Sequence, residues 1–179
     1  ICVNSVIAPP TNDNICGATS LTVGTSCTNT SSQLPATLVA TASPQAACAG
    51  TPDDDVWYKF VATSANHTIA AVGKGGFDPV IDVKNGNCAA SVLECINATA
   101  ANATELLNLT GLTIGQTYNF RVYHAGTGSP IGSSFDVSVY TPLPLQYQFA
   151  QSNGSYSAIS GGTVLGSGTI NNAVYKVVA

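Results

Sequence analysis

Three adjacent carboxylates precede the strongest strand pattern of the chain, in the segment TPDDD at residues 51–55. Neighbouring carboxylates repel one another, so a bound cation or a suitable hydrogen-bonded loop has to offset the repulsion. Calcium suits such a segment because it takes roughly six to eight oxygen ligands from loops. A solvated loop leading into the following strand is the alternative. The residues considered as calcium ligands are Asp53, Asp54, Asp55 and Asp78.

The remaining reactive side chains show no catalytic spacing. No serine stands in a GxSxG turn, and no cysteine is marked as a free nucleophile. The chain has only two Glu, and most of its Asp residues lie in turn-like segments, which disfavours the paired carboxylates of glycoside hydrolases. A Ser–His–Asp grouping of His124 with Asp136 would need a proximity that the spacing does not provide. We therefore interpret the chain as non-enzymatic.

Six cysteines are present, and none forms a CxxC pair or stands at zinc-ligand spacing from a histidine. Paired disulfides in an oxidising compartment are the better interpretation. Cys88 and Cys95 flank the short segment GNCAASVLECIN and are predicted to pair, stapling a loop or hairpin. The other four cysteines allow three connectivities, which the sequence leaves open; they are Cys2, Cys16, Cys27 and Cys48.

Short β-branched and aromatic runs recur along the chain, and helical periodicity is nearly absent. The strand patterns cover residues 56–61, 68–72, 80–83, 105–109, 117–123 and 134–140. In the last of these, Phe135 and Val137 share one face while Asp136 and Ser138 share the other, as in a sheet with one dry face. Turn signals at intervals of about ten residues predict an all-β fold, an antiparallel β-sandwich held by disulfides.

The predicted core combines aromatic and β-branched residues from the strongest strand patterns. These residues are Trp57, Phe60, Phe120, Val122, Phe135 and Val137. Trp57 and Tyr58 are neighbours on one strand, so their side chains point to opposite faces. We expect Trp57 to face the core, and Tyr58, Tyr123 and Tyr140 to be partly exposed.

Composition excludes several classes of protein. The chain of 179 residues is 45% hydrophobic and 8% charged, which is too apolar for a disordered chain. A net charge of −4 with no basic cluster disfavours nucleic-acid binding. No apolar run approaches the roughly 20 residues that span a bilayer, so no membrane insertion is expected in this segment.

Proline-containing segments divide the chain into three predicted parts. Residues 1–10 read as a linker or the end of a preceding segment, and residues 11–141 as the β-sandwich module. Residues 142–179 combine a proline linker with strand-like sequence too short to close its own core. This tail is either the first strands of a second module or an exchanged strand that completes a neighbour's sheet. Because the chain opens at Ile1 and contains no Met, we interpret it as a processed or excised piece.

An ordered set of short motifs carries a family resemblance. The motifs are NDNIC at 12–16, LTVG at 21–24, DVWYKF at 55–60, FDPVIDV at 77–83, NC at 87–88, GQTY at 115–118 and FRV at 120–122. This succession resembles the repeated β-sandwich modules of large secreted and surface proteins of Bacteroidetes, which look like distant relatives of pre-peptidase C-terminal domains. The segment SGGTVLG at 160–166 is similar to the opening of another module in such proteins.

The resemblance implies a jelly-roll-like sandwich that is exported across the outer membrane and acts in adhesion, spacing or carbohydrate binding. The expected function is a non-catalytic structural or adhesive module, with a filament subunit that assembles by strand addition as its sharpest form. Its expected partners are neighbouring modules, identical subunits, glycans or other surface proteins. The alternative is a calcium-dependent carbohydrate- or protein-binding module attached to a secreted enzyme or adhesin. Either function would be extracellular.

Overall fold

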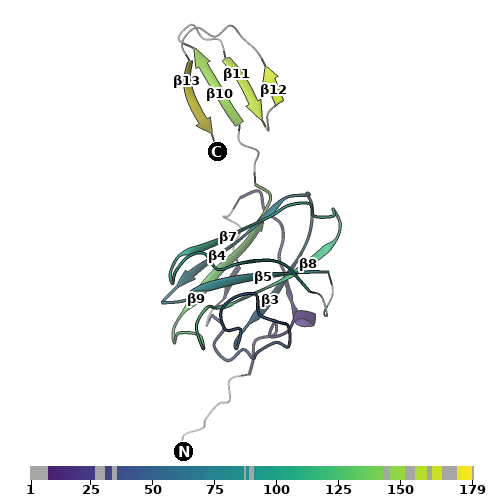
Figure 1. Ribbon diagram of the computed structural model, residues 1–179, viewed down its shortest axis with the longest axis vertical. Helices are drawn as coiled ribbons and strands as arrows, with labels where there is room; N and C mark the ends of the chain where they lie inside the picture. The colour runs from purple at the N-terminus through teal and green to yellow at the C-terminus, as the bar shows by residue number, and fades with distance from the viewer. Residues whose placement is uncertain are drawn as a thin grey trace, which may run out of the picture. The chain divides into compact units, whose positions relative to one another are not determined.

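The computed structural model describes residues 8–26, 31–33, 36–86, 88 and 91–142, and the backbone alone of 146–151, 156–160, 163–166 and 173–178. The chain divides into two compact units, Ile1–Thr141 and Pro142–Ala179 (Figure 1). The first unit ends just after a long strand, and the second begins at a proline, which has no main-chain N–H to continue a ladder. No helix in the described part is long and apolar enough to cross a membrane.

Two sheets form the first unit. The five-stranded sheet has the order β1-β3-β8-β5-β6, and the four-stranded sheet has the order β2-β9-β4-β7. The strands are β1 (Thr19–Ser20), β2 (Ser31–Gln33), β3 (Val56–Val61), β4 (His67–Lys74), β5 (Pro79–Asn85), β6 (Val92–Ile96), β7 (Thr104–Leu109), β8 (Thr117–His124) and β9 (Ser134–Tyr140). Neighbouring strands are antiparallel except for β1 and β3. From β1 to β9 the chain changes sheet at every connection except the one between β5 and β6, which confirms the predicted jelly-roll-like sandwich.

The main core lies between the two sheets. Strand β9 follows the period of two seen in the sequence, with Phe135, Val137 and Val139 fully buried on the inner face. Alternate residues of β3, β5 and β8 meet them from the other sheet, among them Phe60 and Phe120. Five of the six residues predicted for the core lie in this cluster; they are Phe60, Phe120, Val122, Phe135 and Val137.

The outer face of the five-stranded sheet is also buried, because two chain segments cross it. Residues 8–18, which include the short 3-10 helix η1 (Ile15–Gly17), and residues 36–55 contact this face. Trp57 lies here, fully buried against Ile15 and Ala18, and not in the core between the sheets as predicted from the sequence. Its neighbour Tyr58 points the other way, into the main core, and is 1% exposed. The expected exposure of Tyr58 is therefore wrong, and the covering segments explain why both neighbours can be buried.

The second unit is a four-stranded antiparallel sheet with the order β12-β11-β10-β13. Its strands are β10 (Gln146–Gln151), β11 (Tyr156–Ser160), β12 (Thr163–Gly166) and β13 (Ala173–Val178). The central strand β10 pairs with β11 on one side and β13 on the other. The strands predicted in this tail thus hydrogen-bond to one another within the chain.

Candidate functional site

The three carboxylates of residues 53–55 have separate partners. Asp55 is fully buried, and its Oδ2 lies 3.1 Å from Nη1 of Arg121. Asp54 accepts a hydrogen bond of 2.8 Å from the hydroxyl of Thr37. Asp53 accepts from the main-chain N–H of Gly128 in the β8–β9 connection. The three side chains therefore fix three different pieces of chain.

The surroundings of Asp54 favour its neutral form. Burial raises the pKa of this carboxyl to about 7, and the adjacent Asp53 carboxylate adds to the rise. The Thr37 hydroxyl and the main-chain N–H of Ser129 favour the charged form and oppose it. A proton on Asp54 is the simplest way to offset the repulsion between neighbouring carboxylates that the sequence shows.

Asp78, the fourth proposed calcium ligand, lies in the connection between β4 and β5. Its main-chain N–H donates to Nδ1 of His124 at 3.0 Å. Burial raises the pKa of the Asp78 carboxyl, while the nearby His124 opposes the rise. Among the described residues, which include all four proposed ligands, no group of three or more His, Cys, Asp or Glu side chains is arranged to hold a metal ion. The described residues thus do not bring three of the four proposed carboxylates together in one such group, and calcium binding by these residues stays a prediction.

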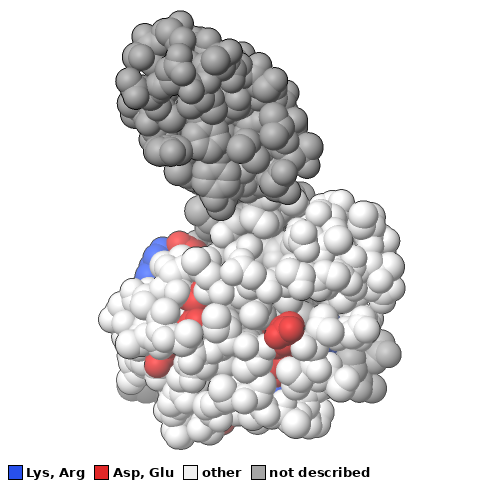
Figure 2. Space-filling view, turned by 45° about the horizontal axis from the view of Figure 1, so that its top comes forward, with Lys and Arg blue, Asp and Glu red and all other residues white. Residues whose placement is uncertain are grey.

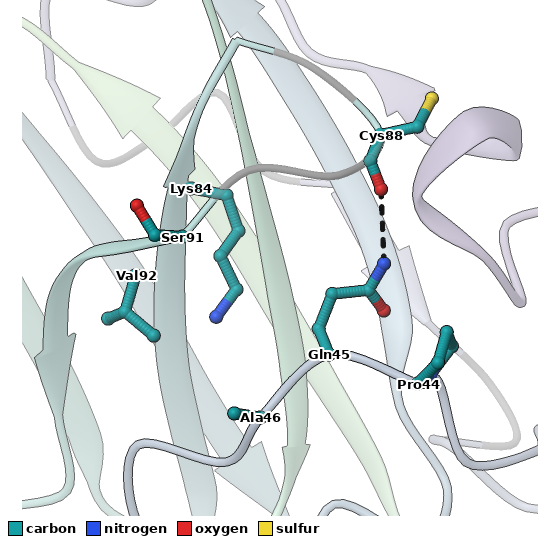
Figure 3. A pocket seen from close by; sticks show the side chains of 7 residues that line it. All are labelled: Pro44, Gln45, Ala46, Lys84, Cys88, Ser91 and Val92. Carbon is teal, nitrogen blue, oxygen red and sulfur yellow. Dashed lines mark hydrogen bonds between the residues drawn. The ribbon is translucent and has the colours of Figure 1, made fainter.

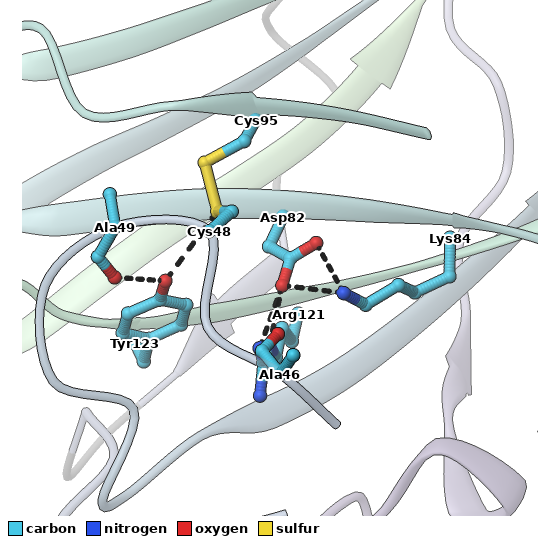
Figure 4. The surroundings of a disulfide bond; sticks show 8 residues. All are labelled: Ala46, Cys48, Ala49, Asp82, Lys84, Cys95, Arg121 and Tyr123. Atoms are coloured by element: carbon cyan, nitrogen blue, oxygen red, sulfur yellow. Dashed lines mark hydrogen bonds and ion pairs between the residues drawn. A yellow bond between two sulfur atoms is a disulfide. The ribbon is translucent and has the colours of Figure 1, made fainter. Parts of the chain in front are cut away.

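A buried ionic network occupies the outer face of the five-stranded sheet (Figure 4). At its centre, Arg121 on β8 lies between two carboxylates, with Nη2 2.8 Å from Oδ2 of Asp82 and Nη1 3.1 Å from Oδ2 of Asp55. Lys84 extends the network through an ion pair of 2.8 Å with Asp82. All four side chains are 0–1% exposed. Two acids and two bases leave the network without net charge.

Strand register and a covering loop assemble this network. Trp57, Arg121 and Asp82 stand opposite one another on β3, β8 and β5, so their side chains share one face. The Arg121 guanidinium lies 5.5 Å from the ring centroid of Trp57 and 5.2 Å from that of Tyr123. Nη2 of Arg121 also donates to the carbonyl oxygen of Ala46 at 2.6 Å. The arginine thus joins the sheet to the loop of residues 36–55.

Tyr123 is a second attachment point for that loop, and its predicted exposure is wrong. Its ring is fully buried, and its hydroxyl donates to the carbonyl oxygen of Ala49 at 2.5 Å. Burial raises the pKa of this phenol. Tyr140 is partly exposed, as expected. Since Tyr58 and Tyr123 are both buried, the three tyrosines do not form an exposed row for stacking on sugars.

The disulfides join the covering segments to the sheet, and the predicted pair of Cys88 with Cys95 is corrected. Cys88 bonds to Cys16 of η1, with their Cα atoms 5.6 Å apart, and Cys95 bonds to Cys48, with Cα atoms 6.1 Å apart. Cys95 stands opposite Asp82 in β6, on the face that the loop bearing Cys48 covers. Cys88 precedes β6, and Figure 3 shows its sulfur directed toward η1. Cys2 and Cys27 lie outside the described residues.

A hollow of about 540 Å³ opens beside the network (Figure 3). Lys84 of β5 lines it together with residues 44–46 of the covering loop and with Cys88, Ser91 and Val92. Figure 3 shows Cys88 beside Gln45, and Ser91 and Val92 across Lys84 from them. Nε2 of Gln45 donates to the carbonyl oxygen of Cys88 at 3.2 Å, which ties the covering loop to the segment before β6. The amide oxygen of Gln45 is buried, and no described group donates to it.

The histidines have structural partners. His124 accepts the N–H of Asp78, whereas Asp136 forms an ion pair with Lys74, so the two residues of the hypothetical Ser–His–Asp grouping are each engaged elsewhere. Nε2 of His67 accepts from two main-chain N–H groups, and its Nδ1 lies 3.1 Å from the hydroxyl of Thr141. Burial lowers the pKa of His67, which favours the neutral ring that this bonding needs.

Sequence reasoning missed Asp82, Lys84 and Arg121 as parts of one site. A signal was present, because Asp82 and Lys84 alternate with the apolar Ile81 and Val83 in β5, and Arg121 stands between Phe120 and Val122. In a chain with 8% charged residues, charges inside strand patterns indicate partners on the same face. Their mutual contact depends on the register of β5 against β8, which a single sequence does not show.

Comparisons of this chain with protein-family models, with curated proteins and with solved structures found no match. The resemblance of its motifs to Bacteroidetes surface modules therefore remains a hypothesis.

Proposed function

We propose that this chain is a non-catalytic structural or adhesive module of a large extracellular surface or secreted protein. The observation that carries the proposal is the use made of its reactive side chains. Arg121, Asp55 and Asp82 are buried in ion pairs, and they attach the loop of residues 36–55 to the sheet. Groups held in this way serve folding and rigidity, and they offer no substrate a reactive atom.

The disulfides support an extracellular location. Two of them link segments that are 72 and 47 residues apart, and both fasten the covering segments to the β5–β6 part of the sheet. Disulfides persist in oxidising compartments and are rare in reducing ones. The surface fits a passive module as well, because charged side chains are few and scattered on the face shown in Figure 2.

In the filament form of the proposal, a strand of an identical subunit adds to β7. This strand is the last in the order of its sheet, pairs with β4 along six consecutive residues and shows no register shift. Leu106, in its middle, is 47% exposed. A regular edge strand offers main-chain groups to an added strand. By contrast, the pairing of β6, the edge strand of the five-stranded sheet, with β5 shifts register between Val83 and Lys84.

Light scattering and negative-stain microscopy of the native material, both without reductant, test this proposal. Filaments with a subunit-sized repeat are the expected result for the assembling form. Leu106→Lys should then shorten them, because a charge on an edge strand opposes strand addition. The exposed Ile131→Lys is the matched control, since Ile131 is 92% exposed and lies outside the strands. A monodisperse monomer would rule out the filament form and leave a spacer or adhesive module.

A further inference from the structure

The hollow beside Lys84 has the volume and the mixed polar and apolar lining of a ligand site. We name it the Gln45 hollow, because the amide oxygen of Gln45 is an unpaired hydrogen-bond acceptor. Its volume of about 540 Å³ falls within the range of roughly 300–1,000 Å³ that is usual for small-molecule sites. It lies above β5, which is hydrogen-bonded to β8 on one side and β6 on the other. The main-chain groups of β5 are therefore used, so recognition here falls to side chains and an added peptide strand is disfavoured.

The amide oxygen of Gln45 lacks a hydrogen-bond donor. Its Nε2 donates to the carbonyl oxygen of Cys88, and this bond fixes which end of the amide is oxygen. The oxygen at the other end is buried and has no partner among the described residues. Leaving a buried acceptor unpaired is unfavourable. A ligand hydroxyl or N–H directed at Gln45 would remove that cost, whereas a purely apolar ligand would not.

The charges at the hollow select a neutral ligand. The ammonium group of Lys84 lies 2.8 Å from both oxygens of Asp82, so its charge is already neutralised and attracts an anion little. The described lining residues include no carboxylate that would attract a cation. A hydroxyl group suits this hollow, since it is neutral and can donate to the unpaired amide oxygen of Gln45.

Apolar atoms complete the hollow. Pro44 and Ala46 line one side, and Val92, which is 39% exposed, lines the other. These groups can pack against the C–H face of a sugar ring, while the amide oxygen of Gln45 accepts from one of its hydroxyls. We propose that the Gln45 hollow binds a neutral saccharide of one or a few units. This binding goes beyond a structural role and would stand or fall independently of filament formation.

Saturation-transfer NMR on the full, oxidised chain tests the proposal. The probes are glucose, galactose, mannose, N-acetylglucosamine, cellobiose and maltose, with glucuronate as the anionic comparison and N-acetyl-alanine amide as the peptide comparison. We expect signal transfer to at least one neutral saccharide and none to the two comparison compounds. Signal from glucuronate or the peptide compound alone, or from no probe at millimolar concentration, would overturn the proposal.

Variants then locate the binding. Gln45→Leu removes the amide and should raise the Kd of the bound saccharide about tenfold or more. Val92→Trp fills the hollow without removing a hydrogen bond and should abolish binding, which keeps the test decisive if Gln45→Leu folds poorly. Gln116→Leu is the matched control, because Gln116 is an exposed glutamine that does not line the hollow. Equal affinities for the control and both hollow variants would place the binding elsewhere and refute the proposal.

Discussion

Replacing Asp54 with asparagine should remove a pH dependence of stability that the wild-type chain carries. Asp54 is 7% exposed, and burial with its neighbour Asp53 raises the pKa of its carboxyl from 3.8 to about 7. The folded state therefore holds a proton on Asp54 in a pH range where the unfolded chain has released it. The asparagine of the Asp54→Asn variant would be neutral at every pH, and its amide oxygen can still accept from Thr37.

The sign and size of the change in unfolding free energy with pH follow from proton linkage. Because the folded state binds the proton more tightly, the free energy of unfolding of the wild type falls as pH rises from about 4 to about 7. At about 1.36 kcal/mol per pKa unit, the difference between 3.8 and about 7 sets an upper limit of about 4 kcal/mol. Asp54→Asn should exceed the stability of the wild type by about 1 kcal/mol at pH 4.5 and by up to about 4 kcal/mol at pH 8.

Urea unfolding between pH 4.5 and 8.5 measures this, with disulfides intact and with the fluorescence of Trp57, the single tryptophan, as the signal. Asp136→Asn is the control with the opposite sign. Hydrogen bonds from Lys74 and Ser32 hold the pKa of Asp136 below its usual value, so its contribution to stability is present at neutral pH and lost in acid. Equal losses of free energy between pH 5 and pH 8 in the wild type and Asp54→Asn would refute the reasoning.

Three further predictions follow from the disulfides, the ionic network and the buried histidine. In single-molecule stretching, reduction of the disulfides should lengthen the extended chain by about 250 Å, because the Cys16–Cys88 bond keeps 72 residue steps of roughly 3.5 Å each from extending. The pair predicted from the sequence, Cys88 with Cys95, would keep only about 25 Å from extending. Arg121→Met should lower the free energy of unfolding by about 3–5 kcal/mol in urea titrations, because it leaves two buried carboxylates without their cation; a loss under about 1 kcal/mol would contradict the network. Burial lowers the pKa of His67, so the unfolded chain gains a proton first and stability falls as pH drops below about 6.5. Against an Asp54→Asn background, His67→Gln should abolish that fall, and its persistence would assign it to another group.

The prediction of the all-β fold rested on the period of two in the strand patterns. Every second residue of β8 and β9 lies in the main core, and a period of two is a local property of the sequence. These core residues are Tyr118, Phe120, Val122, Phe135, Val137 and Val139. In β3 the local signal was ambiguous, because five of six residues are partly or fully buried. Which of Trp57 and Tyr58 faces the main core depends on whether something covers the outer face, and that cover comes from residues 8–18 and 36–55.

For the cysteines, too, the sequence predicts one property and the tertiary structure decides another. Their number and their lack of metal-ligand spacing indicated disulfides, and disulfides are present. Closeness in sequence suggested joining Cys88 to Cys95, but pairing depends on distance and direction in space. The loop that carries Cys48 passes over β6, and η1 brings Cys16 to Cys88, so both partners come from segments far away in sequence.

The sequence by itself determined the all-β class, the strands and most of the main core, because alternation and turn residues act over a few neighbouring positions. Only the tertiary structure decided the disulfide partners, the separate engagement of Asp53, Asp54 and Asp55, and the network around Arg121. Those features depend on strand register and on loops that cross a sheet, and apart from the Lys84–Asp82 pair these contacts join residues 17 to 75 positions apart.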